Sequence, residues 1–84
     1  MSSEVMDVKV YAPFQVYFSG PAESLSASND TGPFDVLPHH KNFMSLLKPG
    51  NLTVRQKGKT DFSMKIDRAI LHVRNNKVSV FLDV

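Results

Sequence analysis

Apolar and polar residues alternate along most of this chain. In several segments every second residue is apolar, as in Val8-Lys9-Val10. Successive side chains of a β-strand point to opposite faces of a sheet, so this period of two indicates strands with one face on a core. The segments that follow the pattern are Val8–Val10, Phe14–Phe18, Leu25–Ala27, Phe34–Val36, Leu52–Val54, Phe62–Ile66 and Val78–Leu82.

Groups of Gly, Pro and Asn separate these segments. Gly and Asn tolerate a positive φ, and Pro restricts φ, so both favour turns. Asn75-Asn76 lies between two apolar runs and predicts a tight hairpin, and Gly58 predicts another. Strand segments that recur about every 8 to 12 residues are typical of antiparallel sandwiches and barrels. The pattern therefore predicts an all-β fold.

One segment does not fit the alternation. His40, Phe43, Met44 and Leu47 are spaced as on one face of a helix. Prolines 38 and 49 bound the segment and limit any helix to about two turns. We expect a loop, a short helical turn or an irregular strand here. Apolar groups outside a strand period either fill one end of the core or form an exposed surface for a partner.

Length and composition restrict the classes of function. The 84 residues, expected to form one domain over 1–84, have 42% hydrophobic residues, 21% charged residues, no cysteine and a net charge of +2. A chain of this size buries only about 60% of its unfolded surface, which favours a binding surface over a deep active site. No apolar run approaches the roughly 20 residues that span a bilayer, so contact with a membrane is expected only through a partner.

No pattern predicts catalysis, a cofactor or a metal. His39 and His40 are adjacent, and adjacent side chains of an extended chain point apart, whereas a metal needs several converging ligands. The carboxylates are scattered, and there is no glycine-rich phosphate loop or nucleophile elbow. Basic residues 55, 57 and 59 alternate along one segment, which leaves a small nucleic-acid-binding β-module as an alternative to a protein-docking domain.

The residues between Gly32 and Gly50 carry a family resemblance. They read GPFDVLPHH and, two residues later, FMSLLKPG. This resembles the N-terminal β-sandwich domain of the epsilon subunit of rotary F-type ATP synthases, whose mitochondrial equivalent is called delta. The resemblance extends over about residues 5 to 84, including a Phe-Ser-Gly at residues 18–20. It implies a flattened antiparallel sandwich of about nine or ten short strands.

The chain departs from the family pattern at several positions. His39 replaces a glycine, Lys41 replaces a small residue, and Pro33 stands where many members carry a carboxylate. The family's C-terminal helical hairpin has no counterpart in the 84 residues, which fits either a naturally short member or a truncated one.

The resemblance also implies a function. The family domain is a non-catalytic part of the central stalk, the rotor, which docks on the gamma subunit and on the membrane c-ring and couples proton flow to ATP synthesis. It lies at the cytoplasmic face of a bacterial energy-transducing membrane, or at the equivalent face of an organelle, and binds no nucleic acid.

Six residues are candidates for these contacts. Gly32 matches the turn that faces the ring, and Asp35 could add a polar contact there. His40 matches a histidine of the ring-proximal loop, with a purely structural loop histidine as the alternative. Phe43, Ser45 and Leu46 match positions where we expect part of the gamma contact, and core packing is the alternative for both apolar residues.

Overall fold

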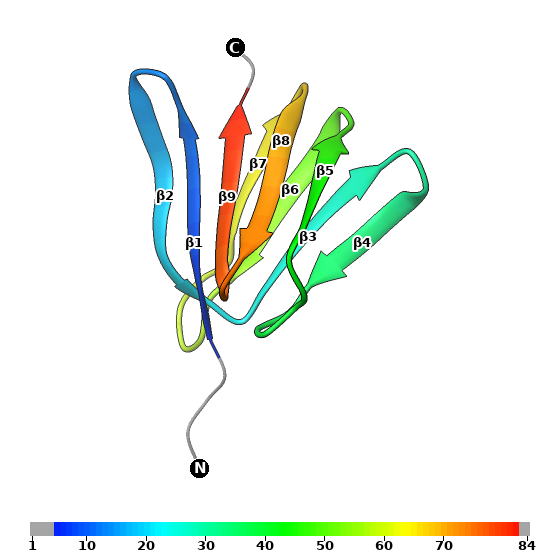
Figure 1. The fold of residues 1–84 in the computed structure, drawn as a ribbon. Coiled ribbons are helices and arrows are strands. Elements are labelled where there is room, and N and C mark those ends of the chain that lie inside the picture. The colour runs from blue at the N-terminus through cyan, green and yellow to red at the C-terminus, as the bar shows by residue number, and fades with distance from the viewer. Residues whose placement is uncertain (1–4, 83–84) are drawn as a thin grey trace.

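Four β-hairpins and one further strand account for almost the whole chain (Figure 1). The computed structural model describes residues 5–82. Its strands are β1 (Met6–Ala12), β2 (Gln15–Ala22), β3 (Ser24–Asn29), β4 (Gly32–Val36), β5 (Phe43–Leu47), β6 (Gly50–Arg55), β7 (Phe62–Ile66), β8 (Ala69–Arg74) and β9 (Lys77–Leu82). The described residues contain no helix, so the predicted all-β fold is confirmed.

The strands form two sheets that pack as a sandwich. One sheet has five strands in the order β2-β1-β9-β8-β5, and the other has four in the order β4-β3-β6-β7. In Figure 1 the five-stranded sheet lies in front of β6 and β7. The neighbouring strands pair antiparallel, except that β1 and β9 run parallel. Because β1 and β9 come from opposite ends of the described chain, this parallel pair closes the larger sheet at its centre.

The core lies between the two sheets and follows the predicted alternation. In β1 and β9 every second side chain is buried, and the residues between them face outward. Leu71 of the five-stranded sheet and Leu52 of the four-stranded sheet are fully buried. Within residues 5–82 no polar or charged residue is buried, so the core is held by apolar packing.

Both predicted hairpins are confirmed. Asn75 and Asn76 join β8 to β9 with φ values of 50° and 63°, as a two-residue turn of type I′ requires. Gly58, with φ of 69°, lies in the longer loop that joins the antiparallel strands β6 and β7. The choice of residue at these turn positions is restricted, because few residues other than Gly and Asn adopt a positive φ.

The expectation of an irregular segment is wrong for residues 43–47, which form the regular edge strand β5. Phe43, Ser45 and Leu47 face the other sheet, whereas Met44 and Leu46 face solvent. The inward row thus holds a serine between two apolar residues and the outward row is also apolar, so this strand lacks the usual apolar-polar alternation. Apolar residues on both faces produced the helical spacing, although pairing of five residues with β8 fixes an extended chain.

A second correction concerns Phe14–Phe18, which the alternation assigned to one buried face. Phe14 lies in the β1–β2 turn and is fully exposed. The pairing of β1 with β2 shifts by one residue between Val10 and Tyr11, so that Val16 lies opposite Tyr11. Such a β-bulge reverses the facing of the following residues. Val16 therefore points outward while Phe18 packs against the core.

Candidate docking surfaces

An unbroken row of apolar residues crosses the outer face of the five-stranded sheet. The strand registers place one outward residue of each strand opposite the next. In order from β2 to β5 the row is Val16, Tyr11, Phe81, Ile70 and Leu46. Four steps between neighbouring strands make it about 19 Å long. We call it the apolar row.

Most of the apolar row is accessible to a partner. Leu46 is 71% exposed, Val16 53%, Ile70 43% and Phe81 36%. The rings of Tyr11 and Phe81 pack against each other with centroids 5.2 Å apart. A shallow depression of about 320 Å³ lies beside Leu46, Ile70 and Phe81. Soluble proteins usually expose apolar residues singly. A contiguous exposed set such as this one therefore indicates an interaction site.

The outer face of the four-stranded sheet has a different composition. Here the registers align Asp35, Ser26, Thr53 and Ser63 across the sheet. The Ser26 hydroxyl donates to Asp35 Oδ1 at 2.6 Å, and the hydroxyl oxygens of Thr53 and Ser63 are 3.3 Å apart. We call these four residues the hydroxyl row. Its polar groups partly satisfy one another, and the row presents little apolar area.

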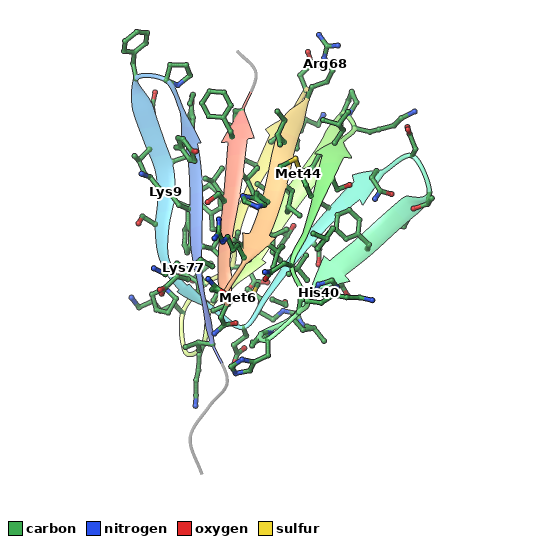
Figure 2. All side chains as sticks on the ribbon, in the orientation of Figure 1. Met6, Lys9, His40, Met44, Arg68 and Lys77 are labelled. Carbon is green, nitrogen blue, oxygen red and sulfur yellow. The ribbon has the colours of Figure 1, made fainter. Side chains whose placement is uncertain are left out.

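The loop between β4 and β5 carries His40 and is fixed by asparagines. Asn76 Oδ1 accepts from the His39 backbone amide at 2.8 Å, and Asn42 Oδ1 accepts from the Asn75 amide at 3.0 Å. The loop therefore lies beside the β8–β9 turn. His40 Nδ1 is 2.8 Å from the Lys41 carbonyl oxygen, so this nitrogen is the donor. Figure 2 places His40 at the end of the molecule opposite Arg68.

Phe43 joins this loop to the interior. Its ring lies 4.7 Å from the His40 ring and 6.3 Å from the Phe34 ring, centroid to centroid. Phe43 is half-buried and packs against the core. These contacts favour the packing alternative for Phe43 and the structural alternative for His40.

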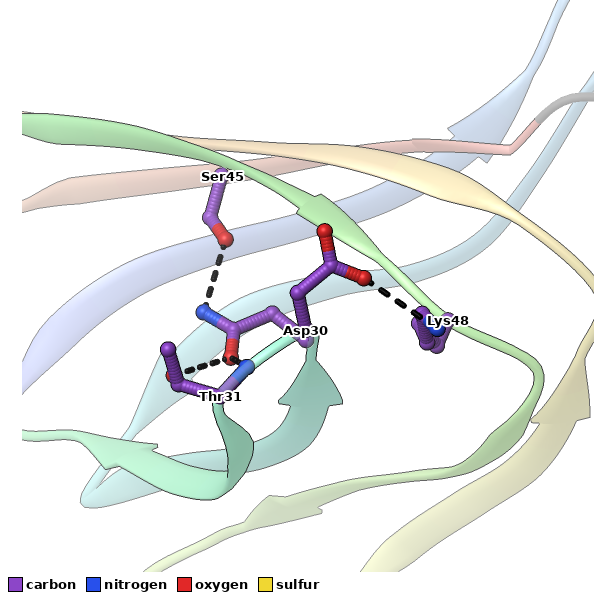
Figure 3. Close-up of polar contacts among 5 residues, drawn as sticks. Asp30, Thr31, Ser45 and Lys48 are labelled. Atoms are coloured by element: carbon purple, nitrogen blue, oxygen red, sulfur yellow. Dashed lines mark hydrogen bonds and ion pairs between the residues drawn. The ribbon is translucent and has the colours of Figure 1, made fainter.

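A polar cluster at the opposite end joins the β3–β4 turn to β5 (Figure 3). Asn29 Nδ2 donates to Ser45 Oγ at 3.0 Å, and Asn29 Oδ1 accepts from the Thr31 amide and hydroxyl. Lys48 Nζ lies 3.2 Å from Asp30 Oδ1, and the Lys48 amide donates to the Ser28 carbonyl at 2.9 Å. We call these contacts the polar clip, because they hold the two sheets together at this end.

The structure does not bring the six predicted site residues onto one surface. Gly32 begins β4 beside the polar clip, and His40 lies beyond the other end of the same strand. The strand alone is about 13 Å long. The two residues therefore lie at opposite ends of β4. Asp35 belongs to the hydroxyl row and Leu46 to the apolar row.

Val16, Tyr11, Ile70 and Phe81 were not predicted from the sequence as surface residues. The sequence did contain a signal for Ile70 and Phe81. Both lie within runs of consecutive apolar residues, 69–71 and 80–82, where the alternation would place a polar residue. A strand that is apolar at consecutive positions is covered on both faces. Only the register shows that these residues of separate strands form one row.

The described residues show no converging set of metal ligands. Within residues 5–82 no group of three His, Asp or Glu side chains is placed to hold an ion. His72 lies on the outward side of β8.

Comparison with known proteins decides the family. The model of the ATP synthase delta/epsilon chain β-sandwich domain matches residues 5–84. The chain belongs to this family.

The relatives agree with the family. An ATP synthase epsilon chain of Wolbachia pipientis is 36% identical over 66 residues, covering 79% of this chain and 57% of the relative. The epsilon chain of Geobacter metallireducens is 30% identical over 81 residues, covering 96% and 58%. The chain thus spans less than two thirds of the length of these curated relatives.

Two solved structures share the fold. A chain of the Euglena gracilis mitochondrial ATP synthase OSCP/F1/c-ring structure superposes with a TM-score of 0.84 at 18% identity, covering 98% of this chain and 52% of that chain. A chain of the central stalk/c-ring structure from Tetrahymena thermophila gives 0.79 at 17% identity, covering 100% and 67%. None of the described residues belongs to a helix long and apolar enough to cross a membrane.

Proposed function

We propose that this protein is a non-catalytic rotor subunit of a rotary, proton-translocating ATP synthase, located on the central stalk. It docks on the gamma subunit and the c-ring and couples proton flow to ATP synthesis. Membership of the delta/epsilon family and the likeness to chains of central-stalk structures support this proposal. The exposed apolar row is the main structural support for docking on a partner.

The gamma subunit binds the outer face of the five-stranded sheet. The apolar row removes apolar area from water when a partner covers it, and aromatic residues at its centre are the usual energetic anchors of interfaces. The row lies on hydrogen-bonded strands rather than on loops, so the contact is preorganised and little conformational entropy is lost on binding.

One end of the sandwich meets the ring. We assign this role to the end that carries Gly32 and the polar clip, because exposed Asp30 and Lys48 can contact polar loops. The clip joins the sheets at this end, so a lateral force on it is carried by both. In this arrangement residues 5–82 act as one rigid domain, and the protein reaches the membrane face only through the ring.

The test compares one substitution on each outer face. Ile70→Asp places a carboxylate in the apolar row, and Ser63→Asp places the same group in the hydroxyl row. Both positions are exposed and lie on strands. We expect Ile70→Asp to weaken binding of the gamma subunit from the same organism by about 100-fold or more, since a charge is buried without a partner. Ser63→Asp should leave binding unchanged.

Biolayer interferometry with purified gamma subunit measures the affinities, and circular dichroism melting confirms that both variants fold. Equal affinities of the two variants, or no binding by the unaltered chain, would contradict the proposal.

A further inference from the structure

Below the apolar row the same outer face becomes basic. Two residues along each strand, the registers align Lys9, Ser79 and His72, and two residues further they align Asp7, Lys77 and Arg74. Figure 2 shows Lys9 and Lys77 on neighbouring strands of this sheet. Two shallow depressions adjoin there, and both are lined by Lys77 and Ser79. We call Lys9, Arg74 and Lys77 the basic cluster.

Within residues 5–82 no ion pair neutralises the basic cluster. Arg74 and Lys77 lie directly opposite each other in an antiparallel pair, and like charges in this position destabilise a sheet. Among residues 5–82 no carboxylate forms an ion pair with any of the three, although Asp7 is opposite Lys77 in the register. Elsewhere in the described chain, Lys48 and Arg55 do pair with aspartates.

The cluster is continuous with the apolar row. Lys9 Nζ lies 4.8 Å from the centre of the Tyr11 ring, and Tyr11 packs on Phe81. Along the strands of the same rigid sheet, Lys9 is about 7 Å from the row, and Lys77 and Arg74 are about 13 Å from it. A partner that covers the apolar row therefore also covers or approaches the basic cluster.

We propose that the basic cluster binds carboxylates of the docking partner, so that the gamma surface on this face is apolar at one end and acidic at the other. This inference rests on the proposed function. When cations without an ion-pair partner lie beside an apolar contact, an acidic partner associates faster, and partners with positive charge at this position are disfavoured. The cost of placing Arg74 opposite Lys77 is offset in the complex.

A single-stranded nucleic acid suits this face less well. Oligonucleotide-binding surfaces stack bases on open aromatic faces. Here the Tyr11 ring already contacts both Phe81 and Lys9. Apart from Tyr11 and Phe81, whose rings pack on each other, the apolar row is aliphatic and has no ring on which a base can stack.

The experiment compares two double variants that each lose two positive charges. The double variant Lys9→Gln/Lys77→Gln changes the basic cluster, and the control Lys57→Gln/Lys65→Gln makes the same change of charge in β7 and the loop before it. Binding of the purified gamma subunit is measured between about 0.01 M and 0.15 M salt, where the screening length falls from about 30 Å to about 8 Å.

We expect the unaltered chain and the control to lose roughly tenfold in affinity over this salt range. The Lys9/Lys77 variant should bind roughly tenfold more weakly than the unaltered chain at low salt and should lose almost nothing further as salt rises. Melting curves of both variants verify that they fold.

The possible outcomes separate the two proposals. No binding by the unaltered chain overturns the proposed function and this inference together. Binding with the same salt dependence in both double variants overturns the inference and leaves the proposed function standing. An oligothymidylate that binds the unaltered chain more tightly than gamma does, and is lost in the Lys9/Lys77 variant, overturns the acidic protein partner in favour of nucleic acid.

Discussion

The two outer faces of this sandwich differ although the sheets beneath them are built alike. The apolar row crosses five strands with aromatic and aliphatic side chains, whereas the hydroxyl row crosses four strands with small polar ones. The inner faces, in contrast, are both aliphatic and fully buried at their centres. Strand geometry allows this because the two faces of a strand are set by independent, alternating residues. One face can therefore stabilise the fold while the other is free to serve binding.

The two outer faces also differ in how far their side chains satisfy one another. On the smaller sheet, Ser26 bonds to Asp35 and Thr53 contacts Ser63, so the row is partly satisfied without a partner. On the larger sheet the apolar groups remain in water, and the basic cluster has no carboxylate bonded to it within residues 5–82. A face that leaves its groups uncompensated gains most from a partner.

The largest effect is expected from substitutions in the core, which test whether the inner faces of the two sheets contribute equally to stability. Leu71→Ala and Leu52→Ala each remove a fully buried side chain, one from each sheet. We expect both to lower the free energy of unfolding by about 2 to 5 kcal/mol, through lost burial and the cavity left behind. Chemical denaturation monitored by circular dichroism measures the loss. A loss below about 1 kcal/mol at only one of the two positions would show that one sheet contributes little to the core.

A smaller effect is expected from substitutions in the apolar row, which compare its central and edge residues in gamma binding. Phe81 lies at its centre and Val16 at its edge. Because the centre of an interface is best shielded from water, Phe81→Ala should weaken gamma binding by roughly tenfold or more, and Val16→Ala by less than about threefold. Calorimetric titration with the gamma subunit checks both values. A larger loss for Val16 would move the docking centre toward the β1–β2 hairpin.

The smallest effect concerns the hydroxyl row. Ser26→Ala removes the hydrogen bond to Asp35 and should cost about 0.5 to 1.5 kcal/mol of folding stability. Gamma binding should not change, because the row faces away from the apolar row. Thermal melting and the same titration provide the two measurements. Weaker binding with unaltered stability would assign the four-stranded sheet to the interface.

The sequence by itself determined the class of fold and most of the core. Alternation identified most of the buried residues of β1, β3, β6 and β9, and the asparagine pair at 75–76 located a hairpin, because both signals are local properties of a pleated chain. The motif between Gly32 and Gly50 likewise pointed to the family that the comparison confirmed.

Only the tertiary structure decided which outward residues meet. The parallel pairing of β1 with β9 brings Tyr11 beside Phe81, and the bulge after Val10 turns Val16 to the same face. Neither follows from a local period, since a register between distant strands is set by how the whole core packs and a one-residue shift reverses every side chain after it. For the same reason Gly32 and His40, close in the sequence, lie at opposite ends of the molecule, while Leu46 and Val16, far apart in the sequence, are the two ends of one row.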